Sequence, residues 1–354
     1  MNTLGRKLRL TTFGESHGPA IGGVLDGFPS NIRIDMEYVA REMMRRRPGQ
    51  SAITTGRTEK DEVEFISGLL EGVSTGTPIA FIIRNTDCRP TDYDDLKDLF
   101  RPSHADYAWQ AKYGIRDWRG GGRSSARVTA PICVAGALAR LALKDRLPDL
   151  DIYAYTSQVG NIAVDSEHEA EFCRDLSEAN SVRCPDQAKA AEMEAFIRQM
   201  KKEGDSTGGI ITCIVRGCPV GLGEPVFGKL QSQLGAAMLG INAVKGFDYG
   251  EGFACASMRG SECNDPFAMK NGAVCTTSNH SGGIQGGISN GQPIRFRVAF
   301  KPTPTIGKEQ QTVNAHGDEV IFKASGRHDP CVVPRAVPIV ESLTALVILD
   351  NILQ

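Results

Sequence analysis

Glycine is strongly clustered in this chain, and that feature constrains the possible folds more than any other. The 354 residues include 39 glycines, with pairs or a triplet at 22–23, 120–122, 208–209, 282–283 and 286–287. Because glycine loses more conformational entropy on folding than other residues, such clusters mark backbone that turns tightly or lies close to a ligand. Several clusters are flanked by Ser, His or Arg, which favours a binding site over disorder.

Composition and charge exclude several broad classes of protein. The apolar content of 41% is sufficient for a sizeable core, and the length permits one or two domains. We expect a single domain over residues 1–354. The formal net charge of −2 gives no general attraction to nucleic acid or to a membrane surface. The N-terminal residues lack the apolar segment of a signal peptide, so we expect a cytoplasmic protein.

The ten cysteines are scattered from Cys88 to Cys331 without a C-x-x-C pair. Their neighbours are small or β-branched residues, as around Cys133 and Cys213. This pattern predicts free, buried thiols rather than a disulfide framework or a metal site.

Hydrophobic periodicity predicts a mixture of strands and helices. Alternating patterns predict strands over Lys7–Phe13, Ile21–Leu25, Ile79–Arg84, Ile210–Val215 and Ile294–Phe300. Helical spacing predicts helices over Met36–Arg47, Arg127–Leu147, Pro185–Lys202 and Val226–Leu239. Asp35 is the expected N-cap of the first helix, and Pro131 should kink the second or delay its start. The third is strongly charged. Strands and helices do not alternate regularly, and no G-x-G-x-x-G follows a strand. We therefore predict an α+β fold with antiparallel sheets packed on central helices.

The first chemically informative motif surrounds Ser16 and His17. Residues 14–18 match G-x-S-x-G, the nucleophile elbow of serine hydrolases, but an elbow requires a following helix. The segment after Gly18 is a poor helix former, so His17 as a proton donor is favoured over Ser16 as a nucleophile. Taken alone, the segment would favour a histidine that merely fills an ordinary turn.

A second motif, RGGGRSSAR at 119–127, has the composition of an anion site. Glycines before a helix start expose backbone N–H groups, and the arginines among them can clamp phosphate or carboxylate. The preceding FRPSHADY at 100–107 supplies a further histidine, His104. A solvated charged surface is the alternative interpretation.

Two glycine-rich segments, 17–29 and 280–293, also resemble each other. Both begin with histidine and contain a glycine pair, so an internal duplication is a hypothesis that competes with chance similarity between hairpins.

The motifs together resemble one known family. In order along the chain stand FGESHG (13–18), RRRPG (45–49), FRPSHADY (100–107), RGGGRSSAR (119–127), INAVKG (241–246), NHSGGIQGGIS (279–289), KPTPT (301–305) and GRHDPC (326–331). This set is similar to the chorismate synthases of the monofunctional bacterial type, over nearly the whole chain. The resemblance implies a β-α-β sandwich, a homotetramer, and a lyase that uses reduced FMN. The implied reaction is the 1,4-anti elimination of phosphate from 5-enolpyruvylshikimate 3-phosphate, giving chorismate.

The resemblance also implies roles for particular residues. His17 would protonate the leaving phosphate, His104 the reduced flavin, and Asp329 would help to deprotonate flavin N5, with Ser16 and Ser125 as relays. We expect neither histidine to belong to the core. The implied flavin contacts are Arg123, Ser124, Ser125, Asn242, Ala243, Gly286, Lys301, Pro302, Thr303, Pro304, Thr305 and Arg327. Arg46, Arg47 and Arg119 are candidates for binding the anionic groups of substrate or NADP.

One departure from the family pattern bears on the reductant. The family often has a second arginine six residues after Arg46, where this chain has Ala52. We therefore expect NADPH to act only indirectly, through a separate flavin reductase. Two rival classes remain, a serine hydrolase built on Ser16 and a non-catalytic protein that binds flavin or a nucleotide.

Overall fold

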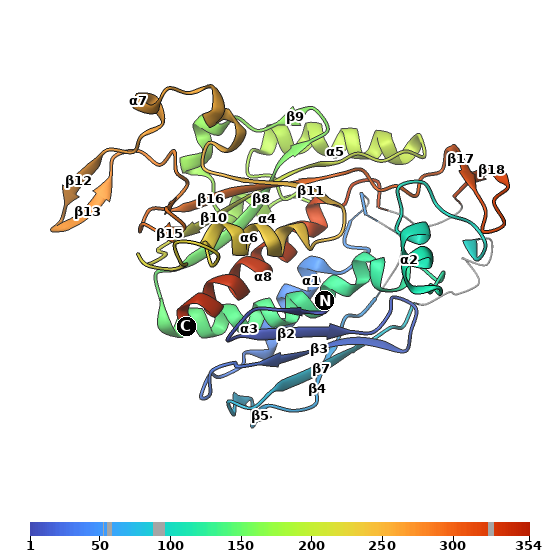
Figure 1. Cartoon of the computed structure of the whole chain (residues 1–354), viewed down its shortest axis with the longest axis horizontal. Coiled ribbons are helices and arrows are strands. Elements are labelled where there is room, and N and C mark those ends of the chain that lie inside the picture. Colours follow the sequence, from blue (N-terminus) through green and yellow to red (C-terminus); the bar gives the residue numbers. More distant parts are fainter. Residues whose placement is uncertain (52, 55–58, 88–95, 325–328) are drawn as a thin grey trace.

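Two antiparallel sheets enclose a layer of helices in the computed structural model, which describes residues 1–51, 53–54, 59–87, 96–324 and 329–354 (Figure 1). The first sheet has the order β1 (Thr3–Leu4), β2 (Arg9–Phe13), β3 (Ala20–Asp26), β7 (Ile79–Arg84), β4 (Val63–Phe65). The second has the order β11 (Val244–Tyr249), β16 (Ile294–Phe300), β10 (Gly209–Arg216), β8 (Asp151–Val159), β9 (Ile162–Ala163). This architecture confirms the predicted α+β fold.

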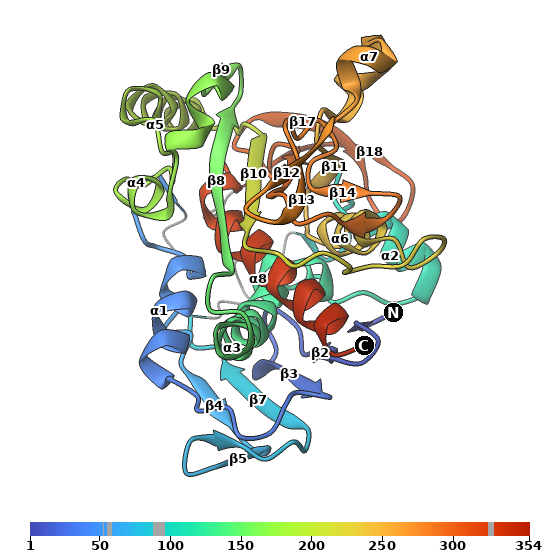
Figure 2. The same cartoon turned by 90° about the vertical axis from the view of Figure 1, so that its left-hand side faces the viewer.

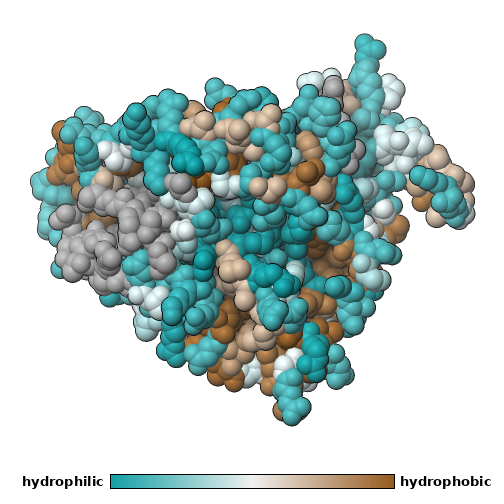
Figure 3. Space-filling view, turned by 180° about the vertical axis from the view of Figure 1, so that it is seen from behind, coloured by the Kyte–Doolittle hydropathy of each residue, from teal (hydrophilic) through white to brown (hydrophobic). Residues whose placement is uncertain are grey.

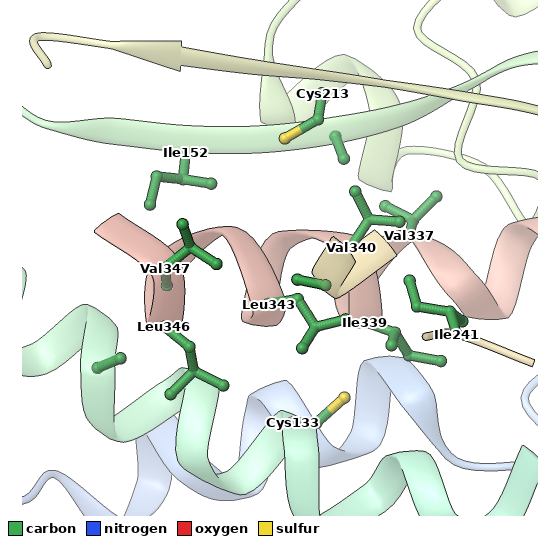
Figure 4. Packing of buried hydrophobic residues seen from close by; sticks show 14 of the residues in the cluster. Cys133, Ile152, Cys213, Ile241, Val337, Ile339, Val340, Leu343, Leu346 and Val347 are labelled. Atoms are coloured by element: carbon green, nitrogen blue, oxygen red, sulfur yellow. The ribbon is translucent and has the colours of Figure 1, made fainter. Parts of the chain in front are cut away.

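Three helices form the central layer: α1 (Met36–Arg46), α3 (Ala130–Arg146) and α8 (Val333–Ile352). Helix α3 packs against β3 on one side and α8 on the other, and α8 in turn covers β8 and β10 (Figure 2). Helix α8 is therefore covered by Ile152 and Cys213 from the second sheet and by Cys133 from α3 (Figure 4). A helix enclosed in this way has no polar face, which explains why α8 is apolar around most of its circumference.

The remaining elements lie around these three layers. The other helices are α2 (Asp106–Tyr113), α4 (Arg174–Glu178), α5 (Gln187–Lys202), α6 (Leu230–Leu239) and α7 (Gly260–Cys263), with 3-10 turns at Gly122–Ser124, Ala126–Thr129, Ser166–Glu171 and Gly252–Ser257. Four hairpins complete the fold: β5–β6 (Leu69–Leu70, Val73–Ser74), β12–β13 (Phe267–Lys270, Ala273–Thr276), β14–β15 (Ile284–Gln285, Ile288–Ser289) and β17–β18 (Glu309–Val313, Glu319–Lys323).

The predicted helix starts are confirmed where local chemistry fixes them. The Asp35 side chain accepts a hydrogen bond from the Tyr38 amide and caps α1 as predicted. Pro131 lies in the first turn of α3, so the regular helix begins at Ala130 after a 3-10 turn. The delay that the proline predicted is therefore present.

Two predicted boundaries are wrong because other contacts use the backbone amides. The amides of Arg6, Lys7 and Leu8 donate to the Asp350 carboxylate of α8, so β2 begins at Arg9 instead of Lys7. The helix predicted from Val226 begins at Leu230, because the Glu224 amide donates to the Gly228 carbonyl and closes a turn.

The cysteines follow their prediction in part. The nine that the structure describes are free thiols, and five of them are buried. Cys255, however, is exposed, and Cys173, Cys263 and Cys275 are half-buried, so burial was predicted too broadly. One stretch among the described residues, Ala126–Arg146, is long and apolar enough to span a membrane, but 72% of its apolar window is buried inside the protein.

Candidate active site

The glycine triplet at 120–122 brings the two candidate histidines together. Its three residues all have positive φ, at 61°, 86° and 52°. A Cβ on Gly120 would lie 2.2 Å from the His17 ring, and one on Gly121 would lie 3.0 Å from the His104 ring. Adjacent Cα atoms are about 3.8 Å apart, so the two imidazoles contact neighbouring residues of a single turn. Only glycine combines this backbone conformation with such close contacts.

His17 lies between β2 and β3, beneath the glycine turn. Its Nδ1 is 3.0 Å from Ser16 Oγ, and that hydroxyl also donates to the Arg119 carbonyl. With its proton used in this way, the hydroxyl accepts from the His17 Nδ1–H. His17 is only 8% exposed, and it lines the cavity described below. The strand β3 follows this segment, and a nucleophile elbow, which needs a helix there, is absent.

His104 lies in the loop that precedes α2. Two other parts of the chain hold this loop: the Phe100 amide donates to the Val313 carbonyl of β17, and Lys301 Nζ donates to the Ser103 carbonyl. His104 Nδ1 lies 2.9 Å from Asp106 Oδ1. The ring is therefore oriented by a carboxylate, whereas His17 is oriented by a hydroxyl.

A cavity of about 500 Å³ opens beside these histidines. Its walls come from the 3-10 turns before α3, the end of β16 with the loop that follows it, and the start of α8. Twelve predicted site residues line it: His17, Arg46, His104, Ser124, Ser125, Asn242, Ala243, Lys301, Thr303, Pro304, Thr305 and Asp329. Motifs as far apart in the sequence as His17 and Asp329 thus converge on one cavity.

The cavity also contains three arginines that were not among the predicted site residues: Arg101, Arg127 and Arg335. Arg127 and Arg46 share the carboxylate of Asp61. Burial by itself raises the pKa of Asp61, but the two arginines outweigh that effect and hold its pKa below the usual value. Arg335 contacts Asp329. Arg101 and Arg127 belong to the motifs that carry His104 and Ser125, and that proximity in sequence was a usable signal.

The other predicted residues lie outside this cavity or outside the described residues. Arg119 and Arg123 line a neighbouring cavity of about 520 Å³ together with Trp109 and Trp118. Ser16 supports His17 from behind, and neither Arg47 nor Pro302 reaches the wall. Arg327 lies outside the described residues.

Gly286 is also separate from the cavity. It is exposed in the turn between β14 and β15. Gly283, just before β14, contacts the start of β16. Lys301 follows the other end of β16, which is seven residues long, so the strand separates the two by roughly 20 Å.

The cavity wall includes a polar side-chain atom that has no hydrogen-bond partner within the protein. Among the described residues, Thr303 Oγ1 is buried without a hydrogen-bond partner. Burying such a group without a partner costs about 1–3 kcal/mol, so a ligand that bonds to it is favoured. Two imidazoles, the Asp329 carboxylate and several arginines complete a cavity that can bind polyanions and move protons.

Comparison with known proteins gives a consistent result. The sequence model described as chorismate synthase matches residues 8–353. A protein named chorismate synthase from Parabacteroides distasonis is 60% identical over 353 residues, covering 100% of this chain and 98% of the relative. One of the same name from Phocaeicola vulgatus is 59% identical over 349 residues, covering 99% and 97%. A solved structure titled "Crystal Structure of Chorismate Synthase" matches with a TM-score of 0.79 at 29% identity, covering 99% of this chain and 92% of that chain.

Proposed function

The chain belongs to the chorismate synthase family, and from this premise we propose that its cavity binds reduced FMN and 5-enolpyruvylshikimate 3-phosphate side by side. The family reaction eliminates phosphate from this substrate and gives chorismate, the last common step of the shikimate pathway to the aromatic amino acids. The enzyme is thus a carbon–oxygen lyase. Bound reduced flavin supplies electron density transiently while the phosphate leaves.

The proposal rests on the two histidines, because both line the cavity but their rings have different hydrogen-bond partners. His17 donates a proton to the leaving phosphate, and Ser16 fixes its ring through Nδ1. His104 would supply a proton to the reduced flavin. Asp329 would accept the proton that flavin N5 takes from the substrate during the elimination, with Ser125 as a relay. Arg335 contacts the Asp329 carboxylate and holds it at the cavity wall.

The flavin contacts follow from the wall of the cavity. Ser124, Ser125, Asn242, Ala243, Lys301 and Thr303 to Thr305 lie on it, and the buried Thr303 hydroxyl provides an unused bond for the cofactor. Pro302 fixes the backbone of the same loop. Arg123 lies behind the glycine turn, where its guanidinium donates to the carbonyls of Thr12 and Gly14. We assign to it, and to Arg327, the role of supporting the flavin site.

The arginines of the cavity favour a substrate with phosphate and two carboxylates. Arg46 and Arg127 share the carboxylate of Asp61, and Arg127 also lies 3.8 Å from Glu59, so the carboxylate that Arg46 binds is divided between two arginines. We assign Arg46 to the substrate, and place Arg47 and Arg119 at the margin of its anionic groups. NADPH then acts through a separate flavin reductase, as Ala52 also suggests.

An exposed hairpin supports a homotetramer. The β12–β13 hairpin projects from the body and exposes Phe267, Met269 and Val274 by 69%, 69% and 64% (Figures 1 and 3). A two-stranded hairpin is at most marginally stable alone, and exposed apolar patches of this kind mark protein contacts. Gly286, remote from the cavity of its own chain, would then contact the flavin of another protomer. We further infer a single-domain enzyme of the cytoplasm.

Anaerobic turnover of 5-enolpyruvylshikimate 3-phosphate with and without reduced FMN tests the proposal. Turnover should require reduced FMN, and oxidised FMN with NADPH alone should not sustain it. His17→Ala and His104→Ala should each reduce turnover by about 10²–10⁴-fold. His104→Ala should also change the absorption spectrum of bound reduced flavin, whereas His17→Ala should leave it nearly unchanged. The reverse pattern would exchange the two roles, and normal turnover in both variants would refute them.

A further inference from the structure

Asp106, the first residue of α2, binds His104 and two arginines at once. It is 4% exposed. Its carboxylate accepts from Arg101 through Nε at 2.7 Å and Nη2 at 2.8 Å, and lies 3.2 Å from Arg116 Nη1. Burial alone raises the pKa of Asp106, but hydrogen bonds from Arg101 and His104 reverse this and hold its pKa well below the usual range. The carboxylate is therefore ionised and can only accept hydrogen bonds.

The ring of His104 has two possible partners for the same nitrogen. Nδ1 lies 2.9 Å from Asp106 Oδ1 and 3.1 Å from Arg101 Nη2. A protonated Nδ1 donates to the carboxylate, whereas an unprotonated Nδ1 accepts from the guanidinium. Arg101 Nη2 already donates to Asp106, at a shorter distance than to the ring. Because the Asp106 carboxylate only accepts, an unprotonated Nδ1 would place its lone pair 2.9 Å from a carboxylate oxygen, whereas a proton on Nδ1 makes this contact a charge-assisted hydrogen bond.

We propose that Asp106 is a positioning residue that keeps a proton on Nδ1 of His104 and so makes Nε2 the atom that exchanges protons in the cavity. The edge of the ring formed by Cε1 and Nε2 lies against Gly121 of the glycine turn. When His104 is an imidazolium, Nε2 releases its proton and the neutral ring keeps the proton that Asp106 binds. The carboxylate stays ionised throughout, so no charge is transferred to it. This inference rests on the proposed role of His104.

The two arginines give this carboxylate a fixed geometry. Arg116 donates through Nη2 to the carbonyls of Leu96, Lys97 and Leu99, and its guanidinium lies over the Phe100 ring. Arg101 holds both oxygens of Asp106. The carboxylate cannot rotate away from His104 without breaking these bonds.

The first experiment observes the proton directly in the unaltered chain. Solid-state NMR of the full-length protein labelled with [15N]histidine distinguishes protonated from unprotonated ring nitrogens, and H104Q identifies the signals of His104 among the six histidines. Above the pH at which the ring loses its charge, His104 should carry its proton on Nδ1. A proton on Nε2 would overturn the inference whatever the activity of the enzyme.

The second experiment changes the carboxylate. In Asp106→Asn, the neutral ring of His104 should move toward the Nε2–H form, and kcat should fall by about 10²-fold, but by no more than in His104→Ala. KM should change by less than about threefold, because Asp106 does not line the substrate cavity. A loss of kcat with His104 still protonated on Nδ1 would show that the residue is merely structural. Asp106→Glu retains the charge and should recover part of the lost kcat if the amide variant folds poorly.

The chain provides a matched control in its other histidine–carboxylate pair. His280 Nδ1 lies 2.8 Å from Glu251 Oε1, and neither residue lines the cavity. Glu251→Gln should change the tautomer of His280 and leave turnover within about twofold of normal. If His104→Ala is fully active, the proposed role of His104 fails while the tautomer measurement still decides the role of Asp106.

Discussion

Arg45 and Arg46 are consecutive residues at the end of α1, yet their side chains enter two different buried clusters. Arg45 binds Glu341 of α8, Glu42 and Glu178, and Arg140 and Arg174 also contact Glu341. Arg46 binds Asp61, which it shares with Arg127, and lines the cavity. The charges of the first cluster, which we call the closed cluster, are paired within the protein. The second, which we call the open cluster, lies on the cavity wall, where a ligand can reach it.

The charge balance of the two arginines differs accordingly. Burial lowers the pKa of both, but for Arg45 three carboxylates outweigh burial and hold its pKa well above the usual value. The pKa of Arg46 is lowered, because burial and the nearby Arg335 outweigh the attraction of Asp61 and Cys133. Burial alone therefore does not decide the role of a charged side chain. A fully compensated arginine stabilises the fold, whereas an undercompensated one beside a cavity is available to an anionic substrate.

The largest expected effect comes from opening the closed cluster. Glu341→Ala leaves three half-buried arginines without their buried central acceptor, and should cost about 3–5 kcal/mol of unfolding free energy. Chemical denaturation of the purified protein measures this loss. The remaining folded enzyme should bind substrate normally, and a large rise in KM would show that the two clusters are not independent.

Changing the open cluster should affect catalysis more than folding. Arg46→Lys keeps the charge but loses the planar fork that matches a phosphate or carboxylate. One charge-assisted hydrogen bond is worth about 1.5–3 kcal/mol, so kcat/KM should fall by about 10- to 100-fold. Steady-state kinetics measure the fall, and Arg45→Lys provides the comparison. A greater loss of kcat/KM in Arg45→Lys would reverse the assignment of the two clusters.

The closed cluster also predicts a dependence of stability on pH. Burial raises the pKa of Glu341, but Arg45, Arg174 and Arg140 reverse this, so its folded pKa lies below the unfolded value of about 4.5. Its stabilisation is therefore complete above that value and is lost as pH falls below it. Between pH 7 and pH 3.5 the unmodified protein should lose on the order of 1 kcal/mol more than Glu341→Gln. Equal losses in the two proteins would contradict an ionised Glu341.

An exposed ion pair should show the smallest effect. Arg198 and Glu194 form an (i, i+4) pair on α5, with side chains 55% and 29% exposed. Solvent weakens such pairs, so Arg198→Ala should change the unfolding free energy by less than about 0.5 kcal/mol. Thermal melts at low and high salt measure the change. A loss of unfolding free energy comparable to that of Glu341→Ala would show that burial does not explain the difference between the exposed pair and the closed cluster.

The sequence by itself determined the α+β class, most element positions and the set of motifs that build the cavity. These features depend on local chemistry or on patterns within one segment, such as the Asp35 cap, the proline in α3 and the period of each strand. The resemblance of these motifs to one family identified the twelve predicted site residues that line the cavity.

Only the tertiary structure decided which way each side chain points and what lies opposite it. Arg45 and Arg46 are identical in type and adjacent in sequence, but a rotation of about 100° per residue in a helix directs them to different partners. Those partners, Glu341 and Asp61, lie nearly 300 and 15 residues away. The contacts of Gly120 and Gly121 with two histidines, and the distance of Gly286 from the cavity, are likewise long-range, and no local pattern encodes them.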